Sequence, residues 1–214
     1  MNRLYKKPKK IFNVFVNYIE ENIKEYFIIS IVFLIGVVLG IIFINKLSED
    51  QLNSLKTYLT SFVTDFKNSN NIDFLLLLKE SISKNIVLLS LLWFMGSTVI
   101  GILFVYLIIG FKGFCLGYAS STIIYSFGAI KGSLFLTTSM LMQNILFIPC
   151  LISLGVSCRK LYKSIIGDRR KENIKLELIR HTLFSVFILI FLILSSFIEV
   201  YMSTKLLNMV IKYI

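Results

Sequence analysis

Long runs of apolar residues alternate with short polar segments along most of the chain. Four runs, at residues 26–45, 86–109, 133–157 and 182–202, are long enough to cross a bilayer as helices. A fifth, at residues 113–130, is diluted by serines, a threonine and three glycines, so it is either a tilted span or a re-entrant element. The pattern predicts an all-α membrane helix bundle with about five transmembrane helices.

Basic residues gather in two of the polar segments. They fill the N-terminal arm, residues 1–25, where an apolar stripe predicts an interfacial helix, and the loop at residues 158–181. The positive-inside rule places both in the cytoplasm, and five spans then place the tail, residues 203–214, outside. Because this rule already accounts for the basic loop, we predict contact with anionic membrane lipids and no nucleic acid as a partner. His181, at the membrane edge of the loop, is expected to be an interfacial side chain.

The longest outer segment, residues 46–85, carries a helical apolar stripe. A second stretch, residues 72–82, repeats the pattern and is expected to run into the second span. Together the two stretches predict an amphipathic helical hairpin on the outer membrane surface. Its apolar face needs a cover, which could be the bilayer, the bundle or another protein. The candidate partner surface consists of Leu52, Leu55, Leu59, Phe62 and Phe66.

Composition narrows the class of function. Of 214 residues, 56% are hydrophobic and only 16% charged, which excludes a water-soluble globule and leaves no segment for a separate catalytic domain. No phosphate loop, zinc-protease motif or nucleophile elbow occurs, so we predict no catalytic residues, no cofactor and no metal site. The three cysteines, Cys115, Cys150 and Cys158, have no disulfide or zinc spacing and are assigned to packing.

Two polar amides lie deep in the fourth predicted span. Gln143 and Asn144 should face other helices and bond across them, and Pro149 should kink the helix nearby. A polar pair beside a kink also lines the midplane site of some transporters. No second intramembrane charge is close to the pair in the sequence, so helix packing is the favoured interpretation.

Small residues at tetrad spacing predict two close helix contacts. Gly36 and Gly40 share one face of the first span, and Gly113 and Gly117 share one face of the third. Lys112 precedes the second pair, where we expect its ammonium to reach the cytoplasmic headgroups from the helix end.

Two segments carry a family resemblance. Residues 110–118, with Lys112, Gly113 and Gly117, and residues 141–149, with Gln143, Asn144 and Pro149, resemble the stage II sporulation protein M family of endospore-forming bacteria. The resemblance implies a mother-cell membrane protein required for engulfment of the forespore, located in the septal and engulfing membrane. It implies a non-enzymatic scaffold that recruits two peptidoglycan hydrolases, stage II sporulation proteins D and P.

Two functions therefore remain open. The first is the scaffold, whose partners would contact the outer hairpin or the glycine faces, and the glycine faces are also compatible with a homo-oligomer. The alternative is a permease-like or pore-forming component with a polar midplane site at Gln143 and Asn144.

Overall fold

The computed structural model describes residues 18–68, 73–167 and 174–206, which are helical apart from short turns and contain no strand. The helices are α2 (Ile23–Ile44), α3 (Glu49–Asn68), α4 (Phe74–Gly96), α5 (Gly101–Phe127), α6 (Ala129–Leu136), η1 (Thr137–Leu141), α7 (Met142–Ile166), α8 (Ile174–Phe197) and η2 (Ile198–Ser203). The elements η1 and η2 are π-helical. The predicted all-α fold is confirmed. Most of the basic arm, part of the basic loop and the tail from residue 207 lie outside the described residues.

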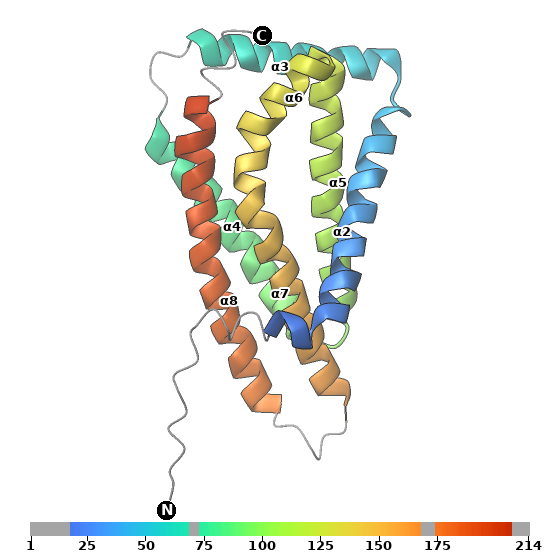
Figure 1. Ribbon diagram of the computed structural model, residues 1–214, viewed down its shortest axis with the longest axis vertical. Helices are drawn as coiled ribbons and strands as arrows, with labels where there is room; N and C mark the ends of the chain where they lie inside the picture. The colour runs from blue at the N-terminus through green and yellow to red at the C-terminus, as the bar shows by residue number, and fades with distance from the viewer. Residues whose placement is uncertain (1–17, 69–72, 168–173, 207–214) are drawn as a thin grey trace, which may run out of the picture.

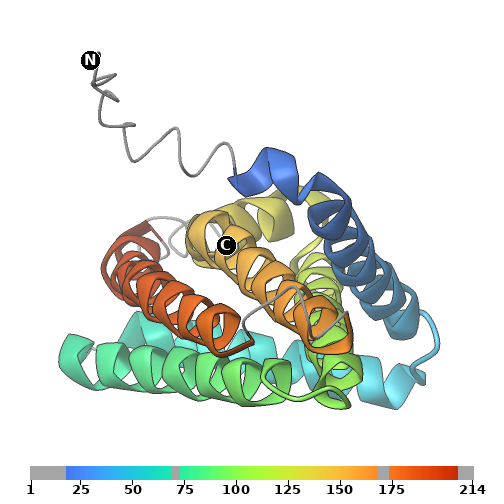
Figure 2. The same ribbon diagram turned by 90° about the horizontal axis from the view of Figure 1, so that it is seen from below.

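The helices form a bundle that α3 closes at one end (Figure 1). Seen from the opposite end, α7 lies between α2 and α8, and α4 runs across one side (Figure 2). Within the described residues, four helical segments are long and apolar enough to cross a membrane, namely Ile23–Ile44, Gly101–Phe127, Gln143–Ile166 and Ile174–Leu206. The more polar α4 also runs from the α3 end to the opposite end (Figure 1). The first residue of α2 and the last residue of η2 therefore lie at opposite ends of the bundle.

The helix bounds differ from the prediction between residues 72 and 130. The run at residues 86–109 is not one helix, because α4 ends at Gly96 and α5 begins at Gly101. A Cβ at Gly101 would overlap the Met95 carbonyl oxygen, and the Gly101 N–H donates to Thr98 Oγ1 at 3.1 Å. The tight turn therefore depends on glycine and on a hydroxyl cap. As a consequence, residues 113–130 are mostly the second half of α5 and not a separate span.

The outer segment forms α3 and the start of α4. The first arm of the predicted hairpin, α3, lies across the end of the bundle, and the second stretch runs into the next helix, because residues 74–82 begin α4. The apolar face of α3 packs on the ends of α5 and α6, where Val63, Ile123 and Phe135 form a small buried cluster. Leu59 and Phe66 of the candidate partner surface pack against this cluster. The bundle itself therefore covers much of the face that the sequence left without a partner.

The closest helix contact joins α2 to α5. A Cβ added to Gly36 would overlap the Gly110 carbonyl oxygen, and one added to Gly40 would overlap that of Phe114. From the other side, Gly113 and Gly117 lie against the backbone of α2. The two glycine pairs therefore face the same interface, where backbone atoms pack directly against each other.

An ion-pair cluster fastens α2 to α7 near the end opposite α3. Glu25, in the first turn of α2, is buried. It pairs with Arg159 at 3.6 Å and with Lys163, and both of these residues belong to α7. No pattern in the sequence indicated that Glu25 turns inward.

Candidate functional site

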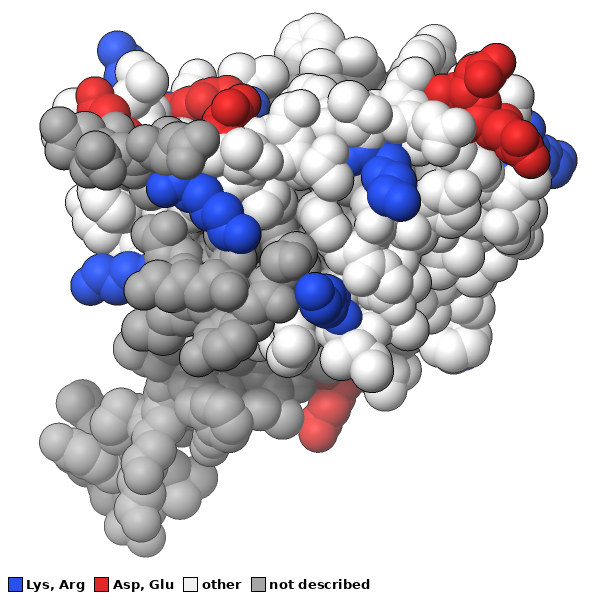
Figure 3. Space-filling model, turned by 90° about the horizontal axis from the view of Figure 1, so that it is seen from above, with Lys and Arg blue, Asp and Glu red and all other residues white. Residues whose placement is uncertain are grey.

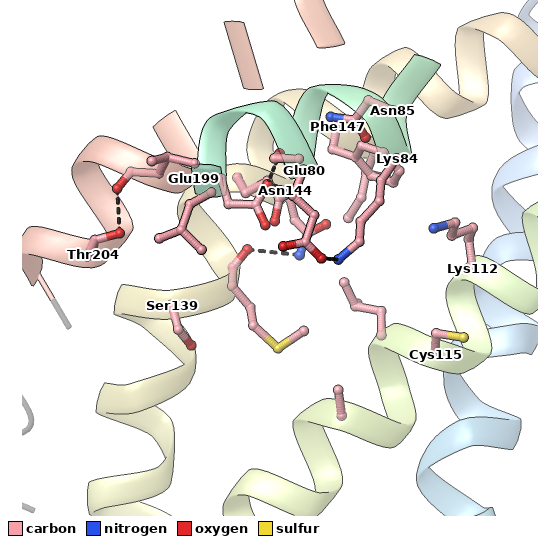
Figure 4. A pocket seen from close by; sticks show the side chains of 18 of the residues that line it. Glu80, Lys84, Asn85, Lys112, Cys115, Ser139, Asn144, Phe147, Glu199 and Thr204 are labelled. Atoms are coloured by element: carbon pink, nitrogen blue, oxygen red, sulfur yellow. Dashed lines mark hydrogen bonds and ion pairs between the residues drawn. The ribbon is translucent and has the colours of Figure 1, made fainter. Parts of the chain in front are cut away.

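A cavity of about 770 Å³ lies beneath α3, between α4, α5, α7 and η2. Phe62 and Phe66 of α3 contribute to its lining, as do apolar side chains such as Phe147. Most of its polar lining comes from four elements: Glu80, Ser81, Lys84 and Asn85 on α4, Lys112 on α5, Gln143 and Asn144 on α7, and Glu199 on η2. Asp73, Ser139 and Thr204 complete it. Figure 4 shows this cavity with most of these side chains.

Glu199 is the centre of a hydrogen-bond network inside the bundle. The Gln143 Nε2 group donates to Glu199 Oε2 at 2.8 Å, and the Ser81 hydroxyl donates to the same oxygen. One turn further along α4, Asn85 donates to Ser196 Oγ at 2.8 Å. The network ties α4, α7 and η2 together through polar groups that would be costly to leave unpaired in hydrocarbon.

Two π-helical turns, η1 and η2, lie at this network. Glu199 lies within η2, and Gln143 follows η1 by two residues. A π-helical turn shifts the angular position of the residues after it relative to a regular α-helix, and such turns are frequent at functional sites. No sequence pattern indicated either turn. The contact between Gln143 and Glu199 therefore could not be read from the helical period.

Asn144 makes its hydrogen bond within its own helical run and not across helices as Gln143 does. Its Nδ2 group donates to the Met140 carbonyl oxygen of its own helical run at 2.8 Å. The expectation that both amides bond across helices is therefore right for Gln143 and wrong for Asn144. Asn144 instead lines the cavity, while Pro149 lies on the exposed side of α7.

Lys112 lies in the middle of the bundle and not at a helix end. It is twelve residues into the 27-residue α5, is half-buried and lines the cavity. The structure overturns the expectation of a headgroup contact because the break at Gly96–Gly101 shifts the whole helix. The ammonium lies 5.9 Å from the centre of the Phe147 ring, within range of a cation–π contact.

The charges of the cavity are arranged unevenly. Glu80 pairs with Lys84 at 2.8 Å along α4, and Glu199 has its two donors. Among the described residues, no carboxylate lies within ion-pair distance of Lys112. In Figure 4 its side chain points from α5 toward the space beside the Glu80–Lys84 pair. The polar amide pair therefore shares one cavity with a lysine and a half-buried glutamate.

Of the other predicted positions, Cys115 lines the cavity, whereas His181, Cys150, Cys158 and the glycines lie outside it. His181 is buried between α7 and α8, where its Nδ1 atom and Ser157 Oγ share a hydrogen bond of 2.8 Å, so it is not an interfacial side chain. Cys150 and Cys158 are buried, whereas Cys115 is exposed and lines the cavity. The glycines lie at the α2–α5 contact described above.

The model of the family named Stage II sporulation protein M matches residues 29–204. The chain belongs to the stage II sporulation protein M family. The matched region runs from α2 to the end of η2 and so includes α3, the glycine contact and the cavity. No curated protein and no solved structure matches the chain. Membership in this family, together with the membrane-spanning helices, makes it a multi-pass sporulation membrane protein. The stage II sporulation protein M family is not a known enzyme family.

Proposed function

We propose that this member of the stage II sporulation protein M family is a non-enzymatic scaffold that anchors the hydrolases D and P at the engulfing septal membrane. The observation that carries the proposal is the family match across the whole bundle, including α3. A bundle with a glycine-packed helix pair and an internal polar network has the fixed geometry that an anchor needs. The positive-inside rule supports placing α3 on the outer face, on the same side as the cell wall.

The surface offered to partners is narrower than the sequence indicated. Leu59 and Phe66 pack on the bundle, and Leu52 and Leu55 are half-buried. Tyr58 is 71% exposed, and Phe62, one turn later, is 44% exposed. Seen from the α3 end, charged side chains of both signs are scattered among uncharged ones, without one dominant charge (Figure 3). Exposed aromatic side chains are frequent anchors of protein interfaces, so we place the contact at Tyr58 and Phe62.

The test is co-purification of the two hydrolases from sporulating cells. Tyr58→Ser combined with Phe62→Ser should reduce hydrolase recovery about ten-fold, as expected for loss of an aromatic anchor, while the amount of variant in the membrane stays unchanged. Tyr58→Phe is the matched control and should retain recovery because it keeps the ring. Unchanged recovery with the double variant would show that this surface does not recruit the hydrolases.

A permease-like role is the second candidate function, and one observation favours it. The amides Gln143 and Asn144 share their cavity with Lys112 and Glu199. The fold therefore brings charged side chains close to the amide pair, although they are distant from it in the sequence. Ionisable side chains inside a membrane bundle commonly mark a substrate or ion path. A path of this kind requires that the cavity contain water.

Cys115 provides a native reporter for water in the cavity. It is exposed and lines the cavity, while Cys150 and Cys158 are buried. If the cavity is open to water, a charged, membrane-impermeant maleimide added to intact protoplasts should label the wild type and leave Cys115→Ser unlabelled. Labelling that appears only after denaturation would exclude a water-filled path from the outside and leave the network as a packing device.

A further inference from the structure

A second, smaller cavity lies at the end of the bundle opposite α3. It has a volume of about 280 Å³ and lies between α7, α8 and the residue that precedes α2 by one turn, Tyr18. Lys160 of α7 and Arg180 of α8 both line it, together with the hydroxyls of Tyr18 and Ser157. None of these groups takes part in the network under α3.

The cavity has an excess of positive charge. Its lining holds two cations and one carboxylate, Glu177, which pairs with Arg180 one turn along α8. Lys160 lies 5.2 Å from the centre of the Tyr18 ring and has no ion-pair partner among the described residues. A ligand with at least one negative charge would therefore complete the site.

The Tyr18 hydroxyl supplies a further donor. Burial raises the pKa of Tyr18 well above its ordinary value, so its phenol stays protonated across the physiological range. Ser157 Oγ and His181 Nδ1 share a hydrogen bond of 2.8 Å, which holds the Ser157 side chain in place in the wall of the cavity. Two cationic groups beside a hydroxyl donor match the oxygen-rich surface of a phosphate group.

The walls of the cavity also fit a lipid. The Tyr18 ring packs against the Phe184 ring, with 5.4 Å between their centres, and both rings are part of the lining. On the outside of α8, Ile179 and Leu183 present exposed apolar surface next to the cavity, along which an acyl chain can lie. The site is at the end that carries the basic loop, which the positive-inside rule assigns to the anionic cytoplasmic leaflet.

We infer that this cavity binds the phosphate of an anionic phospholipid, with Lys160 and Arg180 as counter-charges and Tyr18 as a hydroxyl donor. The lipid would bridge α7 and α8 at the membrane surface. This inference is independent of hydrolase recruitment and of the cavity under α3.

The test uses the full-length protein in detergent, titrated with phosphatidylglycerol and followed by native mass spectrometry. Lys160→Gln should weaken retention of the first lipid about ten-fold, the loss of one charge-assisted hydrogen bond. Lys160→Arg should restore retention, because it keeps the charge. The matched control is Lys175→Gln, an exposed lysine of α8 that does not line the cavity and should leave retention unchanged.

Three further arms decide the source of the phosphate and the integrity of the fold. Phosphatidylcholine should be retained less than phosphatidylglycerol, and inorganic phosphate at the same concentration should not compete. The unfolding midpoint of lipid-free Lys160→Gln should match that of the wild type. Equal phosphatidylglycerol retention by wild type and Lys160→Gln would overturn the site, and full competition by inorganic phosphate would overturn its assignment to a lipid.

Discussion

Replacing Gly36 or Gly113 by alanine should separate α2 from α5 and strongly destabilise the protein. A Cβ at Gly36 would overlap the Gly110 carbonyl oxygen, and one at Gly113 would overlap that of Phe33. Both obstacles are backbone atoms, so no side-chain rotation relieves the clash. Overpacking of this kind costs about 1–3 kcal/mol, and here it also removes the backbone contacts that hold two helices together in lipid. We expect a lower unfolding midpoint of the purified protein and less protein in the membrane.

Gly110 provides the matched control for this prediction. It lies one turn before Gly113 on α5, but a Cβ there would meet its nearest neighbour, Val32 Cγ1, at 3.6 Å, an ordinary van der Waals distance. Gly110→Ala should therefore leave the unfolding midpoint nearly unchanged. Equal midpoints for Gly110→Ala and Gly113→Ala would mean that the helices do not pack through this interface.

Glu25→Gln should destabilise the opposite end of the bundle. The Glu25 side chain is only 11% exposed and holds Arg159 and Lys163, so its loss leaves a largely buried guanidinium without its carboxylate. Breaking a buried pair costs about 3–5 kcal/mol. Because the Lys163 side chain is 56% exposed and partly screened by water, we expect about 1–3 kcal/mol here. The measurement is the unfolding midpoint in detergent of matched composition.

Two comparisons make this prediction specific to the ion-pair cluster. Glu21→Gln removes an exposed carboxylate four residues earlier and should have little effect. Exchanging the charges, with Glu25→Arg and Arg159→Glu together, should recover part of the stability that either single exchange loses. If Glu25→Gln and Glu21→Gln have the same midpoint, the cluster does not stabilise the contact between α2 and α7.

The sequence predicts the helical class, most of α2 and the glycine faces of α2 and α5, because each rests on a local and periodic signal. It misses the turn between α4 and α5, since apolar residues continue across it. The available signal was the pair Gly96 and Gly101 with Thr98 between them, a combination that favours a tight turn. That single error moved Lys112 from the middle of a helix to its end.

The polar network and the cover of α3 depend on contacts between residues far apart in the chain. Glu199 lies within one π-helical turn and Gln143 follows another by two residues, and helical periodicity assumes that no such turn is present. Similarly, the apolar stripe of α3 is visible in the sequence. Its burial against Ile123 and Phe135 depends on where α5 and α6 lie in the fold. These features require the tertiary structure.

The proposed scaffold role is tested most directly by a photo-crosslinking amino acid at Tyr58, activated in sporulating cells during engulfment. Tyr58 is exposed on α3 and does not contribute to the buried cluster beneath it. The scaffold predicts crosslinks from this position to hydrolase D or P, and none from the same amino acid at Phe27, an exposed position on α2 within the membrane. Normal engulfment by the Tyr58 variant without any crosslink to either hydrolase would contradict it.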